Sequence, residues 1–188
     1  MDNRINIIDC ALQLFAERGY DAVGVQEIVD AAGITKPTLY HYFGSKHGLL
    51  DAVLAENFKS LFDLVEQAAH YQGDLVFTLE EVTRTLFDFS STHPAFYRLI
   101  LSLWFAPRNS EALLAVSQFN HRLFGIIETV FTLAVREHGN MKNRQLHYAS
   151  TFLGMINTYI GLSLNGYLTL DDKLVYTCVH QFMHGILS

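Results

Sequence analysis

Apolar side chains recur at helical spacing along almost the whole chain, and this feature most constrains the fold. Ile5, Ile8 and Leu12 stand at i, i+3 and i+7, and Phe15 extends the same face of a helix. No segment shows sustained apolar–polar alternation between hairpin turns, and three prolines in 188 residues leave room for long helices. The sequence therefore predicts an all-α fold with about nine helices.

Glycines, prolines and capping patterns set the expected helix boundaries. Gly19 and Gly33 end the first two helices, and a short third helix is expected at residues 37–43, with Thr35 or Lys36 at its N-cap. The patterns TLEE at residues 78–81 and TLDD at residues 169–172 resemble capping boxes and are expected to open the fifth and ninth helices. The remaining expected ranges run from residue 46 to about Gly73, Pro94 to Pro107, Ser110 to Gly139, and Lys142 to Gly166.

The segment from Val25 to Phe43 has the pattern of a helix-turn-helix. Gly33 can adopt the backbone conformation that a sharp turn needs, and Ile28 and Leu39 are placed to pack the two helices together. In such a motif the second helix enters the major groove of DNA, where the base edges are readable. The alternative is an ordinary helical corner with core aromatics. Because Tyr40 and Tyr42 are two residues apart, they cannot share a helix face, so at least one must be exposed.

The stretch VQEIVDAAGITKPTLYHYFGSKHGLLDAV resembles the N-terminal signature of the TetR/AcrR family of bacterial transcriptional regulators. The resemblance implies a helix-turn-helix DNA-binding domain at residues 1–47 and a larger helical ligand-binding and dimerisation domain at residues 48–188. Gly24 departs from the family, which often has Ser or Thr before the second helix. By the family's pattern, the positions that face DNA are Gln26, Thr35, Lys36, Pro37, Thr38, Tyr40, His41, Tyr42 and Lys46.

Positive charge in the N-terminal part of the chain is confined to a short stretch. The whole chain has a formal net charge of −6, and residues 1–56 hold four Lys and Arg against eight Asp and Glu. Residues 31–46 contain Lys36 and Lys46 and no acidic residue. Because contacts with phosphates dominate affinity for DNA, we expect modest affinity per monomer, helped by dimerisation.

Aromatic residues are dense between Leu86 and Phe131, where most rings are expected in the core. Resemblance to the family implies an effector pocket within the fourth to eighth helices. Arg98 lies in an apolar setting and is expected to pair with Asp88 or Glu128, to extend to water, or to bind a ligand carboxylate. The candidate ligand-binding residues are Arg98, Trp104, Phe105, Asn120, His121, Phe124, Asn157 and Tyr159.

Residues 145–170 contain no Asp, Glu, Lys or Arg, yet they carry too many polar residues and glycines for a membrane span. Gly154, Thr158 and Gly161 form a strip of small residues on one helix face. We expect this helix and the last one to form a four-helix interface in a homodimer, as the resemblance also implies. The alternative is that the strip packs only against its own chain.

The sequence offers little for other functions. It contains no H-E-x-x-H, Walker or G-x-S-x-G motif, so we expect no enzyme and no cofactor. His180 and His184 are at i, i+4, but two ligands are too few for a structural metal site. Two separated cysteines form no disulfide framework, which favours the cytoplasm.

Together these features predict a ligand-responsive regulator that binds double-stranded DNA. We expect a repressor released from a palindromic operator by a small, largely apolar or aromatic effector, although the motif alone is compatible with release or promotion of DNA binding. The alternative is a helical sensor that has lost DNA binding, which the acidic head (residues 1–47) allows.

Overall fold

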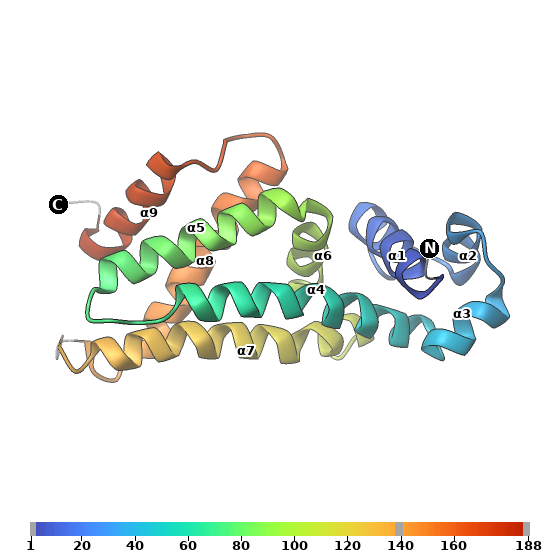
Figure 1. The fold of residues 1–188 in the computed structure, drawn as a ribbon, viewed down its shortest axis with the longest axis horizontal. Coiled ribbons are helices and arrows are strands. Elements are labelled where there is room, and N and C mark those ends of the chain that lie inside the picture. Colours follow the sequence, from blue (N-terminus) through green and yellow to red (C-terminus); the bar gives the residue numbers. More distant parts are fainter. Residues whose placement is uncertain (1–2, 138–140, 186–188) are drawn as a thin grey trace. The chain divides into compact units, whose positions relative to one another are not determined.

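The structure of the chain is a computed structural model that describes residues 3–137 and 141–185. These residues form nine α-helices and no strand, which confirms the predicted all-α fold (Figure 1). The helices are α1 (Asn3–Arg18), α2 (Val25–Ala32), α3 (Lys36–Phe43), α4 (Lys46–Ala68), α5 (Leu75–Thr92), α6 (Pro94–Trp104), α7 (Glu111–Ala134), α8 (Gln145–Leu164) and α9 (Asp172–His184). Within the described ranges, no helix combines the length and apolar character needed to cross a membrane.

The chain packs into two compact units. Unit 1 comprises Met1–Ser60 and His93–Phe119, and unit 2 comprises Leu61–Thr92 and Asn120–Ser188. The expected domain boundary between residues 47 and 48 stays a prediction. Both α4 and α7 contribute residues to the two units.

In unit 1, α1 packs against α2 and α6, and α2 packs against α3. The expected stripe of α1 is buried at Ile8, Leu12 and Phe15, while Ile5 at its end is exposed. Phe58 of α4 stacks on Phe119 of α7 with ring centroids 4.6 Å apart. The first three helices thus pack in sequence, α1 against α2 and α2 against α3 (Figure 1), and the buried apolar side chains of α1 stabilise this unit.

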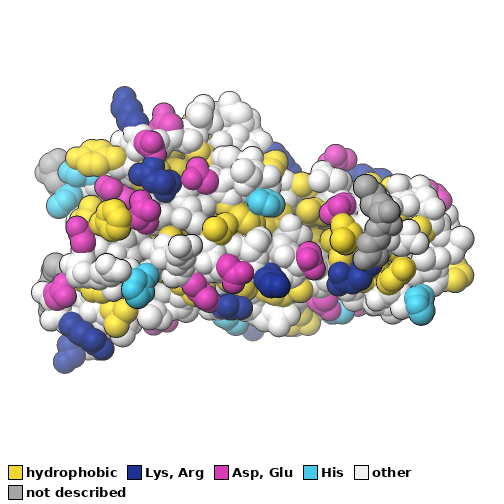
Figure 2. Space-filling model, in the orientation of Figure 1, with side chains coloured by type: hydrophobic (Ala, Val, Ile, Leu, Met, Phe, Trp, Pro, Cys, Tyr) yellow, Lys and Arg dark blue, Asp and Glu magenta, His cyan; other side chains and the backbone are white. Residues whose placement is uncertain are grey.

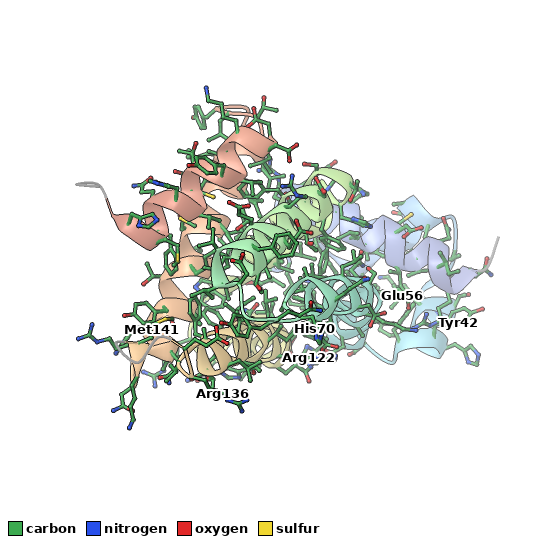
Figure 3. The ribbon with its side chains drawn as sticks, turned by 60° about the vertical axis from the view of Figure 1, so that its left-hand side comes forward. Tyr42, Glu56, His70, Arg122, Arg136 and Met141 are labelled. Atoms are coloured by element: carbon green, nitrogen blue, oxygen red, sulfur yellow. The ribbon has the colours of Figure 1, made fainter. Side chains whose placement is uncertain are left out.

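In unit 2, α5 packs against α8 and α9. Phe152 of α8 lies 5.3 Å, centroid to centroid, from Phe182 of α9 and 6.3 Å from Phe131 of α7. At the surface, Arg122 (labelled in Figure 3) donates a hydrogen bond of 2.7 Å to Glu66 of α4 and covers the ring of Phe62. Aromatic packing thus joins α7, α8 and α9 in this unit.

Two predicted capping boxes are wrong, for the same reason. α5 begins three residues before Thr78, because the carboxylate of Asp74 accepts the Phe77 N–H at 2.9 Å. α9 begins after Asp171, whose carboxylate accepts the Leu174 N–H at 2.8 Å. A carboxylate suits the positive end of a helix dipole better than a neutral hydroxyl does.

The remaining boundaries lie close to those expected. Ser110 caps α7 as predicted, since its hydroxyl accepts the Leu113 N–H at 3.1 Å. α7 ends at Ala134, whereas the expected end at Gly139 lies outside the described residues. α4 ends at Ala68 rather than near Gly73, and α8 begins at Gln145 rather than Lys142.

Candidate DNA-binding surface

The turn between α2 and α3 depends on one glycine. Gly33 has φ 65° and ψ 34°, in the left-handed region that side chains disfavour. The N–H of Ile34 then reaches back to the carbonyl of Val29 at 3.0 Å, which closes the C-terminus of α2. The chain is thereby redirected within two residues into Thr35, the N-cap of α3.

One buried side chain anchors α3. Leu39 is 0% exposed, and Ile28 of α2 is also 0% exposed. Phe43, at the end of α3, is half-buried. Because α3 has eight residues and a single fully buried one, its position depends strongly on Leu39.

The N-terminus of α3 faces outward with its polar groups. Thr35 makes no side-chain cap; its hydroxyl instead lies 3.0 Å from the hydroxyl of Thr38. Pro37 occupies the first turn, where the missing N–H is not needed. N–H groups at a helix N-terminus can receive a phosphate oxygen, so this end suits a DNA backbone contact.

The predicted DNA-facing residues lie at the surface of unit 1. Tyr40 is 46% exposed and Tyr42 is 41% exposed, so both of these rings are accessible, as Figure 3 shows for Tyr42 at the edge of α3. The ring of His41 lies against that of Tyr42, with centroids 5.6 Å apart. The exposed candidates are Gln26, Thr35, Lys36, Pro37, Tyr40, His41 and Tyr42, and the half-buried ones are Thr38 and Lys46.

Two further candidates contact side chains that are not themselves candidates. Gln26 donates a 2.7 Å hydrogen bond to Asp30, one turn further along α2. The ammonium of Lys46 lies over the ring of Tyr20, 4.2 Å from its centroid. Burial lowers the pKa of Lys46, although the carboxylates of Asp21, Glu111 and Glu27 act in the opposite direction.

One acidic residue of α2, Glu27, is partly neutralised. Glu27 accepts the Gly24 N–H at 2.9 Å and pairs with Arg18 of α1. That backbone hydrogen bond and the Arg18 side chain lower the pKa of Glu27. Glycine at the N-cap therefore keeps half of a capping box, because Glu27 supplies the reciprocal bond. Acidic and basic side chains are interspersed on the face of the molecule that Figure 2 shows.

The predicted ligand-binding residues divide between the units. Arg98, Trp104 and Phe105 belong to unit 1 and are exposed. The candidates in unit 2 are His121, which is exposed, and the half-buried Asn120, Phe124, Asn157 and Tyr159. Their assignment to an effector stays a prediction.

Sequence reasoning missed a groove in unit 2. It has a volume of about 830 Å³ and lies between the end of α4 and the start of α5, where Leu64, His70, Phe77 and Thr78 are among its lining residues. None of the eight ligand-binding candidates lines it. The residue that could have indicated this groove is Phe77, a large apolar residue three positions after the N-cap residue Asp74. Its side chain is 60% exposed.

Within the described ranges, no three His, Cys, Asp or Glu side chains come close enough together to hold a metal ion. The rings of His180 and His184 lie 4.6 Å apart on the exposed side of α9.

Comparison with known proteins gives a family match at the N-terminus and one along the full length. A family model described as bacterial regulatory proteins, tetR family, matches residues 7–53. The protein named HTH-type transcriptional activator FasR from Mycolicibacterium smegmatis is 37% identical over 187 residues, which cover 100% of this chain and 84% of that protein. HTH-type transcriptional repressor KstR2 from Rhodococcus jostii is 38% identical over 85 residues, 45% of this chain and 42% of that protein.

Solved structures share the fold. FadR from Bacillus subtilis in complex with stearoyl-CoA has a TM-score of 0.81 and 20% identity, over 97% of this chain and 98% of that one. AibR in complex with isovaleryl coenzyme A and operator DNA has a TM-score of 0.77 and 21% identity, over 98% of this chain and 99% of that one. These relatives are DNA-binding transcriptional regulators rather than enzymes, as the sequence predicts. The 37% identity to one such regulator along the whole chain, together with the family match over the helix-turn-helix, shows that this chain belongs to the TetR family of bacterial transcriptional regulators.

Proposed function

We propose that this chain represses transcription as a homodimer that leaves a palindromic operator when a small, largely apolar or aromatic effector binds. The observation that carries the proposal is the orientation of α3, which buries Leu39 and exposes Lys36, Tyr40 and Tyr42. A recognition helix in a major groove needs this division between an anchored apolar side and an exposed polar side.

The proposed roles follow from side-chain chemistry. Lys36 contacts a phosphate or a base edge, and Pro37 and Tyr40 offer apolar contact to a thymine methyl group. Thr35 and Thr38 hold the end of α3 against a phosphate, with His41, Tyr42 and Lys46 as further donors to the backbone. Gln26 would contact a phosphate only after releasing Asp30.

We propose that α8 and α9 form the dimer interface. Gly154 and Thr158 are exposed, and a Cβ atom added at Gly154 or Gly161 would meet no atom within 4 Å. An added side chain would therefore meet nothing of the described part of its own chain at these two glycines, which supports an interface between chains over packing within one chain. A two-fold copy can approach closely at such a strip and bury the same surface on both partners.

Changing Gly154 to Glu is expected to convert the dimer to a monomer. The side chain would enter the closest part of the interface and bury an unpaired charge there. Light scattering coupled to size-exclusion chromatography measures the mass. Gly125→Glu is the matched control, because Gly125 is also an exposed helical glycine with no atom within 4 Å of an added Cβ. A dimer that survives Gly154→Glu would place the interface elsewhere.

Two named relatives differ in the direction of their regulation. KstR2, which matches over 85 residues, is named a repressor, whereas FasR, which matches along the full length, is named an activator. A ligand that favours one arrangement of the dimer over another shifts the DNA-binding equilibrium by its differential affinity, and we propose that the arrangement favoured here is the one that leaves the operator.

The test uses an operator selected from random duplexes and stearoyl-CoA as probe, since that molecule is bound to the FadR structure of the same fold. We expect stearoyl-CoA to lower operator affinity at least about tenfold, equivalent to about 1.4 kcal/mol of differential binding. Free coenzyme A is the control for the apolar chain and should leave the affinity unchanged. Tighter operator binding with stearoyl-CoA would contradict release and indicate an activator.

A further inference from the structure

Three side chains of unit 1 link the head to α7. The ring of Tyr20, in the loop between α1 and α2, lies under the ammonium of Lys46 at the start of α4. The hydroxyl of the same tyrosine donates a hydrogen bond of 3.1 Å to the carboxylate of Glu111. Glu111 is the first residue of α7. Tyr20 thus contacts both Lys46, which is predicted to face DNA, and the first residue of α7.

The tyrosine is fixed firmly enough to hold this arrangement. Tyr20 is buried, and its ring meets Phe15 of α1 edge to face at 5.2 Å. Burial, followed by the hydrogen bond to Glu111, raises the pKa of Tyr20, so the hydroxyl keeps its proton and remains a donor. A cation over the face of a neutral aromatic ring is attracted by the ring quadrupole.

The charges around Lys46 favour the same position. Asp21, Glu27 and Glu111 all stabilise its ammonium form. Lys46 is half-buried, unlike Lys36, which is exposed. These three carboxylates compete with a DNA phosphate for the same ammonium, because each of them lowers the electrostatic gain that a phosphate contact would bring.

We propose that Tyr20 and Glu111 form an autoinhibitory contact that keeps Lys46 from DNA phosphates, so that Glu111 on α7 limits the affinity for DNA. This inference rests on the proposed role of Lys46 at the DNA backbone. The helix that carries Glu111 continues to Ala134, and its residues from Asn120 onward belong to unit 2. A change in α7 can therefore reach Glu111 along one continuous helix and, from there, Lys46 through the non-covalent contacts of Tyr20.

The test is a double-mutant cycle with Glu111→Gln and Lys46→Met. Glutamine keeps an acceptor for the Tyr20 hydroxyl and removes the charge, and methionine keeps an apolar stem over the ring. Binding to a fluorescent random-sequence duplex is measured at several KCl concentrations, because the slope of log K against log salt changes by about 0.9 for each phosphate contact. Asp9→Asn controls for net charge, since Asp9 is an exposed carboxylate of α1 in the same unit.

We expect Glu111→Gln to steepen the slope by about 0.9 and to raise affinity several-fold at low salt, with a clearly smaller gain for Asp9→Asn. Lys46→Met should remove about 0.9 from the slope in the Glu111→Gln background and less than half of that in the wild-type background. Equal losses in both backgrounds, or equal gains from Glu111→Gln and Asp9→Asn, would overturn the autoinhibitory contact. Absence of salt-dependent binding by the wild-type chain would instead overturn the proposed DNA contacts, and this inference with them.

Discussion

Replacing Leu39 with alanine is expected to lower the free energy of unfolding by about 2–5 kcal/mol and to abolish DNA binding. Leu39 is 0% exposed and is the only fully buried residue of α3, so the substitution leaves a cavity under the recognition helix. α3 is too short to be stable without tertiary packing. Urea unfolding followed by circular dichroism measures the stability, and fluorescence anisotropy with duplex DNA measures the binding.

Leu114→Ala is the matched control for this prediction. Leu114 lies on α7 in the same unit and is 62% exposed, so the same chemical change removes almost no buried surface. We expect a change within about 0.5 kcal/mol and unaltered DNA binding. Similar losses from the two variants would show that Leu39 does not anchor α3 in solution.

Replacing Lys36 with alanine is expected to weaken DNA binding about tenfold at 0.1 M salt and to reduce the salt slope by about 0.9. Lys36 is exposed at the first position of α3, so its ammonium can reach a phosphate at little desolvation cost. Anisotropy titrations over a range of KCl concentrations measure both quantities. Thermal unfolding of the variant should match that of the wild-type chain, because the side chain is not part of the core.

The control for Lys36 is Lys59→Ala, which removes the same charge from an exposed position on α4. A general electrostatic effect would weaken DNA binding equally in both variants. A specific contact weakens it in Lys36→Ala alone and leaves the salt slope of Lys59→Ala close to that of the wild-type chain. Equal slopes in the two variants would exclude Lys36 as a phosphate contact.

The sequence predicted the helices and the helix-turn-helix well because local rules determine them. A glycine in the left-handed conformation was required at the turn, and Gly33 has φ 65°. The periodicity that marked Leu39 as core and required at least one of Tyr40 and Tyr42 to be exposed is a property of the helix itself. The caps at Asp74 and Asp171 were missed because two candidate caps competed over a few residues, and the carboxylate is the stronger one.

Contacts between distant residues were beyond the reach of these rules. Nothing in the spacing of Tyr20 and Glu111 shows that they meet, since 91 residues separate them. Lys46 looked like a free surface cation for the same reason. The effector candidates were chosen by residue type within the expected fourth to eighth helices, and type alone does not reveal which of them share a cavity.

The uncharged surface of α8 has a practical consequence. Ser150, Gly154, Thr158 and Leu162 leave this exposed side without an ionic group, so mobile ions have nothing to screen there. Affinity for DNA, in contrast, falls steeply as the salt concentration rises. Concentrated KCl should therefore strip the protein from nucleic acid during purification while a dimer formed as we propose, with α8 at its interface, remains associated.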